Sequence, residues 1–140
     1  MSGPVHRCGR IVRVREIEHR VAAARQAAAE RRVADLLEVA RRIEMLRSSL
    51  GTSQGESDGQ SLKAMSEMLS RLGKAEGDLA RPIGEAEAIR ERASVVRLAA
   101  RTREDGAGRL REKAAAREAG AATVREDAER IHRIASRRHA

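Results

Sequence analysis

The chain of 140 residues contains no phenylalanine, tyrosine or tryptophan. Because aromatic side chains fill much of most protein cores, their absence argues against an ordinary globular domain. Cys8 is the only cysteine, so no disulfide can form within the chain, and we expect a reducing compartment. The sequence shows neither the apolar run of a secretory signal nor the roughly 18–20 apolar residues of a membrane span. We therefore expect a cytoplasmic protein.

Charged residues, by contrast, are abundant. The chain has 26 Arg, 3 Lys and 21 acidic residues, which give a net charge of +8. A basic excess favours phosphate groups or acidic proteins as partners. Here, however, acids alternate with arginines along the chain, which is typical of the solvated surface of long helices. Binding to nucleic acid therefore stays open as an alternative rather than the leading interpretation.

A seven-residue repeat runs through the C-terminal half of the chain. Every seventh residue is apolar: Met65, Leu72, Leu79, Ala86, Ala93, Ala100, Ala107, Ala114, Ala121, Ala128 and Ala135. Most positions three residues further on are apolar too, among them Met68, Ile89, Val96, Leu110, Val124 and Ile131. A 3-4 spacing kept over about ten heptads predicts a coiled coil.

The N-terminal half predicts a first helix over residues 10–50. Its expected seam is Ile11, Val14, Ile17 and Val21 at the start and Leu36, Val39, Ile43, Leu46 and Leu50 at the end. The step from Val21 to Leu36 is one residue more than two heptads. This extra residue predicts a local drift in the phase of the supercoil.

Residues 51–60 are the only stretch with consistent turn chemistry. Gly51 suits the left-handed position after a helix, and Ser57, Asp58 or Ser61 is the expected N-cap of the next helix. The sequence thus predicts one all-α coiled-coil domain over residues 1–140. It consists of a frayed tail (1–9), a helix (10–50), a turn (51–60) and a longer helix (61–137) that together form an antiparallel hairpin.

The second helix contains two sets of potential helix breakers. Pro82 lies among glycines, and Gly106 and Gly108 flank Ala107. The heptad phase is the same on both sides of each spot, so we expect one bent helix rather than two. At 1.5 Å per residue the helices would be about 60 and 115 Å long, which leaves the chain beyond about Arg103 without a partner.

Signs of catalysis are weak. No metalloprotease, paired-cysteine or phosphate-loop motif is present. His6 and Cys8 resemble half of a metal site, but no second pair completes it. We expect no catalytic residues, no cofactor and no metal, and therefore a protein that is not an enzyme.

The layout resembles a known family. An Arg- and Val-rich start leads into an Ala-rich first helix (residues 10–24), Arg47-Ser-Ser-Leu-Gly stands at the turn, and a longer charged helix follows. In these features the chain is similar to the FliJ family of flagellar export proteins and to the related YscO-type stalk proteins of injectisomes. The resemblance covers nearly the whole chain and is one of layout and composition.

The resemblance implies a stalk that couples a hexameric export ATPase to the membrane export gate and binds export chaperones. It places the protein in the cytoplasm, at the periphery of the membrane export apparatus. The stripe matching the gate-binding residues of the family is Met68, Leu72, Ala75 and Leu79. The helix ends that would meet the ATPase ring contain Arg10, Arg13, Val14, Ile131 and Ile134.

Two alternatives come from the residues alone. One is a generic coiled-coil adaptor, homodimeric or not, unrelated to secretion. The other is a basic helical protein associated with nucleic acid. Met65 and Met68 illustrate the choice, because we favour a place for them in the hairpin core while a methionine can also form part of an adaptable binding surface.

Overall fold

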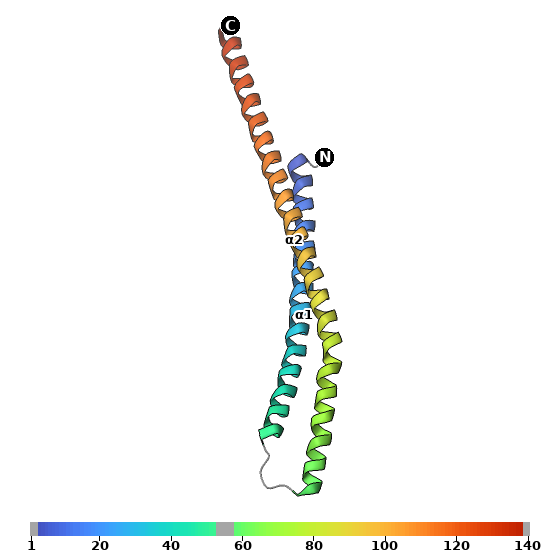
Figure 1. The fold of residues 1–140 in the computed structure, drawn as a ribbon. Helices are drawn as coiled ribbons and strands as arrows, with labels where there is room; N and C mark the ends of the chain where they lie inside the picture. Colours follow the sequence, from blue (N-terminus) through green and yellow to red (C-terminus); the bar gives the residue numbers. More distant parts are fainter. Residues whose placement is uncertain (1–2, 53–57, 139–140) are drawn as a thin grey trace. The chain divides into compact units, whose positions relative to one another are not determined.

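The computed structural model describes residues 3–52 and 58–138, and these residues form two helices, α1 (Pro4–Thr52) and α2 (Gly59–Arg138). The described residues contain no strand. The helices pack against each other in opposite directions, and α2 is the longer one (Figure 1). The predicted fold class, an antiparallel helical hairpin with a longer second helix, is confirmed.

The first helix begins earlier and ends later than expected. Pro4 is its first residue, where a fixed φ and a missing N–H suit a helix start, so the expected tail over residues 1–9 is corrected to helix from Pro4. Gly51 lies inside α1, and no described glycine has a positive φ, so its predicted role as a left-handed terminator is wrong. The central part of the predicted turn, with Ser57, lies outside the described residues.

Asp58 caps the second helix, as one of the three predicted candidates. Its Oδ1 accepts a hydrogen bond from the backbone N–H of Ser61 at 2.9 Å, and its carbonyl accepts one from Leu62 at 3.1 Å. The bonds from Ser61 lower the pKa of the Asp58 carboxyl below its ordinary value. The cap satisfies N–H groups that the first turn of α2 leaves without partners.

The second helix continues through its predicted weak points. It runs unbroken past Pro82, Gly106 and Gly108, which confirms one continuous helix. A proline in a helix interior removes one backbone hydrogen bond and costs about 3 kcal/mol or more. Burial of the neighbouring Ile83 and Ala86 against α1 helps to offset that cost.

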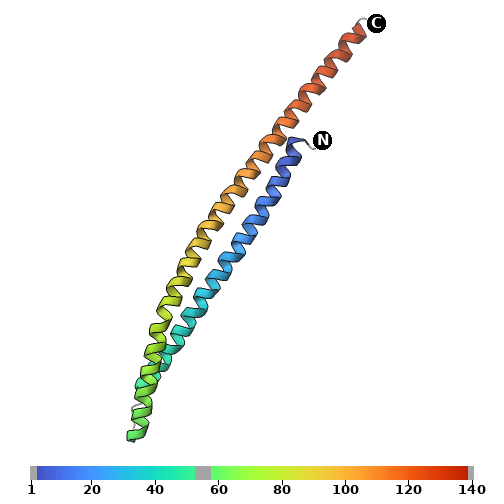
Figure 2. The same ribbon diagram turned by 90° about the vertical axis from the view of Figure 1, so that its right-hand side faces the viewer.

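The packing divides the chain into two compact units that we describe separately. Unit 2 comprises Ala22–Val96. Its core is Val33, Leu36 and Ala86, with Leu79 and Ile83 packed against them. Within unit 2 the end of α1 and the start of α2 lie side by side and run in opposite directions (Figures 1 and 2).

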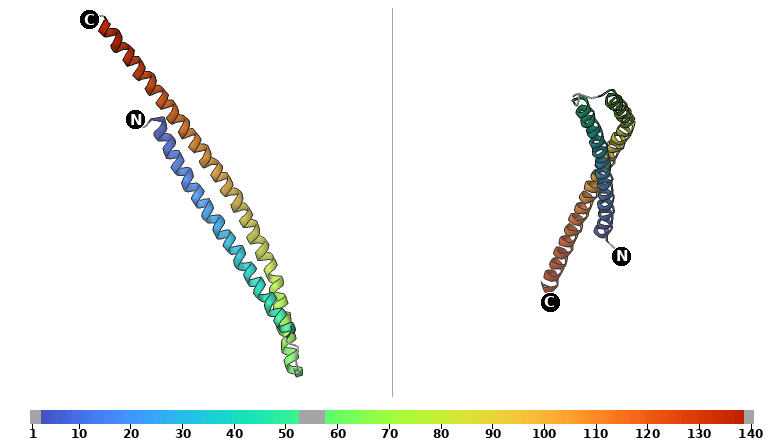
Figure 3. Two further views of the ribbon diagram at one scale, coloured as in Figure 1. Left: turned by 90° about the vertical axis from the view of Figure 1, so that its left-hand side faces the viewer. Right: turned by 90° about the horizontal axis from the view of Figure 1, so that it is seen from below.

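Unit 1 comprises Met1–Val21 together with Arg97–Ala140. Its buried apolar residues are Val12, Ala100 and Ala107. The backbone N–H of Val5 donates to Glu118 Oε1 at 3.4 Å, so α1 accompanies α2 as far as Glu118 and not only to Arg103. The predicted start of the unpaired segment is corrected accordingly, because α1 begins at Pro4. Beyond Glu118 every described side chain is exposed, and no other described segment lies beside α2 (Figure 3, left).

The predicted seam of α1 is wrong at its start and partly confirmed at its end, where Leu36 is buried and Ile43 and Leu50 are half-buried. The four aliphatic residues expected at its start are exposed: Ile11 (49%), Val14 (53%), Ile17 (59%) and Val21 (45%). The buried residues of α1 are Val12, Ala22, Ala29, Val33 and Leu36. These residues keep one heptad phase from Val12 to Leu36, so this part of α1 shows no phase drift. Ala22 and Ala29 occupy two positions of this buried row. The row keeps its phase because small residues are accepted there, and larger aliphatic side chains remain exposed to solvent.

Of the two apolar rows predicted for α2, the row of every seventh residue from Met65 is confirmed as far as Ala107 and the row three residues further on is wrong. Ala86, Ala100 and Ala107 of the predicted row are buried. The second row of contacts, however, lies four residues further on and not three, and it includes Leu69 and Ile83. The residues three further on stay half exposed: Met68, Ile89, Val96 and Leu110. Each helix therefore carries a wider apolar face than its partner covers.

In each unit a basic and an acidic side chain form a pair between the two helices. Arg47 of α1 pairs with Glu76 of α2 in unit 2. In unit 1, His19 Nδ1 lies 2.5 Å from Glu104 Oε2. Each pair therefore fixes the register of the helices within its own unit.

Candidate partner-binding surfaces

The described residues offer little to a reaction. No three His, Cys, Asp or Glu side chains among them lie close enough together to hold a metal ion. Cys8 belongs to α1 and is partly buried, so it does not lie in a tail. Among the described histidines, His19 is the one that contacts an acidic side chain of the other helix, and its Nε2 is buried without a hydrogen-bond partner. The pair joins two helices and borders no enclosed cavity, which is the arrangement of a structural contact.

An acidic hollow of about 470 Å³ lies on one face of unit 1. Four carboxylates and one guanidinium line it: Glu16, Glu104, Asp105, Glu112 and Arg109. Glu104 is already engaged by His19. The hollow is open, and its acids belong to the solvated charged surface of the two helices.

The predicted gate-binding stripe divides between surface and core. Met68, Leu72 and Ala75 line one shallow hollow of about 480 Å³ in unit 2. Met68 is 52% exposed, whereas Leu72 and Ala75 are partly buried. Leu79 packs against the core of unit 2 and does not line this hollow. Three of the four predicted residues thus share one accessible surface.

The predicted ring-binding residues all lie in unit 1 but do not form one patch. Arg10, Arg13 and Val14 are exposed on α1, in the part that α2 accompanies. Ile131 (68% exposed) and Ile134 (51%) lie on α2 beyond Glu118, where α1 has already ended. Together with Ala135 and Arg138, these two isoleucines line a hollow of about 430 Å³.

Unit 2 also contains a groove that was not predicted from the sequence. It has a volume of about 540 Å³ and runs between the helices, with a mostly alanine wall on α1 and an aliphatic wall on α2. The lining residues are Ala22, Arg25, Ala28 and Ala29 on α1 and Ile89, Arg92, Ala93 and Val96 on α2. A signal was present in the sequence, because Ile89 and Val96 repeat at seven residues beside the alanine row.

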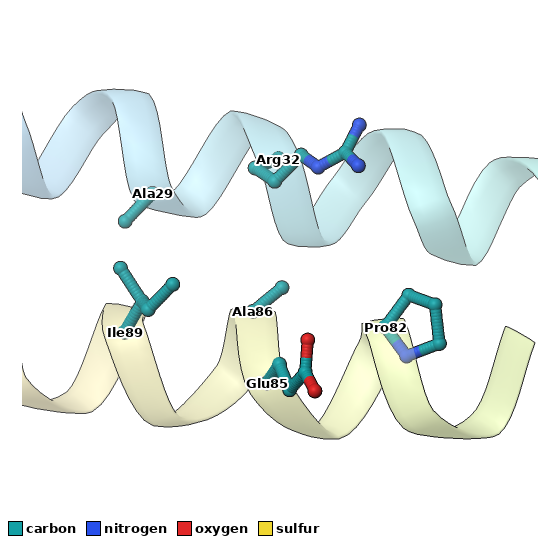
Figure 4. Close-up of a pocket in the computed structure, with 6 residues that line it drawn as sticks. All are labelled: Ala29, Arg32, Pro82, Glu85, Ala86 and Ile89. Atoms are coloured by element: carbon teal, nitrogen blue, oxygen red, sulfur yellow. The ribbon is translucent and has the colours of Figure 1, made fainter.

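The groove continues into a second hollow of about 220 Å³ that shares Ala29 and Ile89 with it. Figure 4 shows Ala29 of α1 and Ala86 and Ile89 of α2 pointing into the space between the helices. Arg32 and Glu85 also line this second hollow, one from each helix. Glu85 accepts a hydrogen bond from Arg81 at 2.9 Å, so its charge is already partly compensated.

Arg25 and Arg92 give the groove its charge. One comes from each wall, both are exposed, and neither forms a hydrogen bond or an ion pair with another described residue. Some other arginines of unit 2 are paired, since Arg41 and Arg42 contact Glu38 at 2.9 and 3.1 Å. Hydrogen bonds from these two arginines lower the pKa of Glu38 to about 2. The apolar groove therefore lies between two arginines that have no acid of their own.

Net charge differs sharply between the units. Unit 2 contains 12 basic and 12 acidic residues, whereas unit 1 contains 17 basic and 9 acidic ones. The whole excess of +8 thus belongs to unit 1. After Glu129, the last acidic residue, four arginines lie between Arg130 and Arg138 around Ile131 and Ile134. That end of α2 combines exposed aliphatic side chains with uncompensated positive charge.

Neither helix, over its described residues, has a segment that is long and apolar enough to span a membrane. Comparisons with models of protein families, with curated proteins and with solved structures found no match.

Proposed function

We propose that this chain is a non-enzymatic stalk component of a flagellar or type III protein export apparatus. In this role it couples a hexameric export ATPase to the membrane export gate and binds export chaperones. It acts in the cytoplasm, at the periphery of the membrane export apparatus. The proposal builds on the resemblance of layout to FliJ-type and YscO-type proteins.

The observation that carries the proposal is the end of α2 beyond Glu118. A single helix of 20 described residues extends past the last contact with α1 and exposes Val124, Ile131 and Ile134. An exposed aliphatic surface on a helix without a partner favours association with another protein. Its four terminal arginines favour a ring whose contact surface is acidic.

The hollow formed by Met68, Leu72 and Ala75 supports a second contact. It is accessible, apolar and flanked by Glu67 and Arg71. Met68 can adapt its flexible side chain to a partner without loss of the hairpin core, because it is half exposed. This surface is the one that the proposal assigns to the export gate.

The test uses the purified 140-residue chain and a hexameric ATPase of a flagellar or type III export apparatus. We expect the chain to bind the hexamer and raise its ATPase rate. Replacing Ile131 and Ile134 by serine should weaken binding about tenfold or more, since each exposed aliphatic anchor contributes on the order of 1 kcal/mol or more.

The matched control replaces Val95 and Leu98 by serine. These residues have the same three-residue spacing on the same helix, and their exposed fractions are 61% and 67%. Binding unaffected by either double variant, or absent altogether, would leave a generic coiled-coil adaptor as the better interpretation. Retention on duplex DNA that falls steeply with salt would favour the nucleic-acid alternative.

A further inference from the structure

We propose that the groove of unit 2 between Arg25 and Arg92 binds an amphipathic helix of another protein, one whose apolar stripe is flanked by acidic residues. The inference does not rest on the proposed role in export. It depends on the shape, the lining and the unpaired charge of one groove.

The shape of the groove suits a helix. Two antiparallel helices leave a furrow along their length, into which side-chain ridges of a third helix can pack. Ala22, Ala28 and Ala29 form one wall, so a third backbone can approach closely, while Ile89 and Val96 offer aliphatic contact. With the adjoining hollow the groove extends to Pro82 along α2, which is about 20 Å or roughly four turns of a docked helix.

The fold itself uses only part of the lining. Ile89 and Val96 are 52% and 53% exposed, and Ala28 is exposed as well. The hairpin buries Ala22 and Ala29 of the alanine wall and leaves Ala28, Ile89 and Val96 uncovered. An apolar groove that its own chain leaves open is the usual setting for a docked helix.

Charge identifies the kind of helix. Arg25 and Arg92 lie on opposite walls without any partner among the described residues. A helix that carries Glu or Asp on both sides of its apolar stripe would pair with both arginines, whereas lysines there would be repelled. The groove therefore selects acidic flanks.

The same charges argue against a second copy of this chain as the occupant. A symmetric dimer through the groove would bring four unpaired arginines together. Insertion of the free end of α2 from another copy is disfavoured too, because residues 119–138 carry five arginines and three acids. The occupant is thus a different protein.

The experiment measures binding of two synthetic helical peptides to the full-length protein by fluorescence anisotropy at low ionic strength. Both peptides are about 18 residues long with leucine at the a and d positions. One carries glutamate and the other lysine at the flanking e and g positions. We expect the glutamate peptide to bind at least about tenfold more tightly.

Charge reversal is the decisive variant. Arg25→Glu combined with Arg92→Glu should invert the preference, so that the lysine peptide binds more tightly. The control, Arg31→Glu with Arg90→Glu, changes the net charge equally at two exposed arginines of unit 2 that do not line the groove. This control should keep the preference for glutamate. Equal effects of the two double variants would overturn the proposal.

Two adjacent alanines test the groove itself. Ala28→Gln fills the alanine wall, whereas Ala27→Gln alters an exposed neighbour outside the lining. We expect the first variant to weaken glutamate-peptide binding about tenfold and the second to leave it unchanged, at equal helicity by circular dichroism. Self-association that Ala28→Gln abolishes, without binding of either peptide, would show that a second copy fills the groove and would overturn the proposal.

Discussion

Units 1 and 2 are built from the same two helices, but unit 2 buries larger aliphatic side chains than unit 1 does. Unit 2 buries Val33 and Leu36 in one cluster with Ala86, Leu79 and Ile83. Unit 1 buries one valine and two alanines, Val12, Ala100 and Ala107, and exposes Ile11, Val14 and Ile17. Since stabilisation grows with apolar area buried, unit 2 supplies most of the stability of the hairpin.

Charge follows the same division. Unit 2 is neutral, whereas unit 1 carries the entire excess of +8. Like charges repel within a folded unit and attract anionic partners from outside it. The comparison indicates that unit 1 is arranged for association more than for internal stability, and that unit 2 stabilises the hairpin and adds one apolar groove.

The largest expected effect is loss of the core of unit 2. Leu36→Ala should lower the free energy of unfolding by about 3 kcal/mol, because it leaves a cavity beside Val33 and Ala86. Val33→Ala should cost about 2 kcal/mol, and Val12→Ala in unit 1 about 1 kcal/mol, since Val12 faces mainly small side chains. Urea unfolding followed by circular dichroism measures all three.

Val14→Ala is the control for this comparison, because Val14 is 53% exposed, and it should change stability by less than about 0.5 kcal/mol. If Val12→Ala cost as much as Val33→Ala, the units would be equally stable and the division between them would be wrong.

Hydrogen exchange tests the same comparison residue by residue. Amides beyond Glu118 should exchange fastest among the described residues, since that part of α2 has no packed neighbour. Amides of Val33–Leu36 and of Leu79–Ala86 should exchange slowest. The expected difference in protection is about 100-fold or more. Protection of residues 119–138 equal to that of the core, at concentrations where the chain is monomeric, would contradict the proposed order of stability.

The sequence predicts the helices well and the packing only in part. Every seventh residue from Met65 is apolar, and this row does face α1 as far as Ala107, since a strict heptad phase leaves one continuous face on a helix. Asp58 was identifiable as a cap candidate because its side chain suits that role. Local chemistry and periodicity determine these features.

The start of the seam of α1 was mispredicted because both of its candidate faces are apolar. Ile11 and Val14 lie on one of these faces and Val12 lies on the other. Hydropathy favours the face with Ile11 and Val14, because it carries more large aliphatic residues. The structure selects the row containing Val12, Ala22 and Ala29, which keeps its phase and permits close approach of α2. The groove with Arg25 and Arg92 follows from that selection. Such a site depends on which of two apolar rows is buried, and one sequence does not decide this.

The smallest effect that we expect is a loss of stability of unit 2 at acidic pH. Arg41 and Arg42 lower the pKa of Glu38 to about 2, and Ser61 lowers the pKa of Asp58. A carboxyl whose pKa is lower in the folded than in the unfolded chain stabilises the fold above its unfolded pKa, near 4, and that contribution is lost as the pH falls further. The melting temperature should therefore decline modestly between about pH 4 and pH 2.

Asp58→Ser separates the titration from the cap. Serine accepts the same backbone hydrogen bond but has no carboxyl to titrate, so this variant should melt close to the wild type at neutral pH and lose less stability in acid.

Glu38→Gln, which removes the partner of Arg41 and Arg42, should likewise reduce the loss of stability in acid. Both groups are exposed, so screening by 0.5 M salt should shrink the Glu38 effect, whereas the hydrogen bond that caps α2 should persist. An acid response that stays unchanged in both variants would show that Asp58 and Glu38 do not cause it and would contradict this prediction.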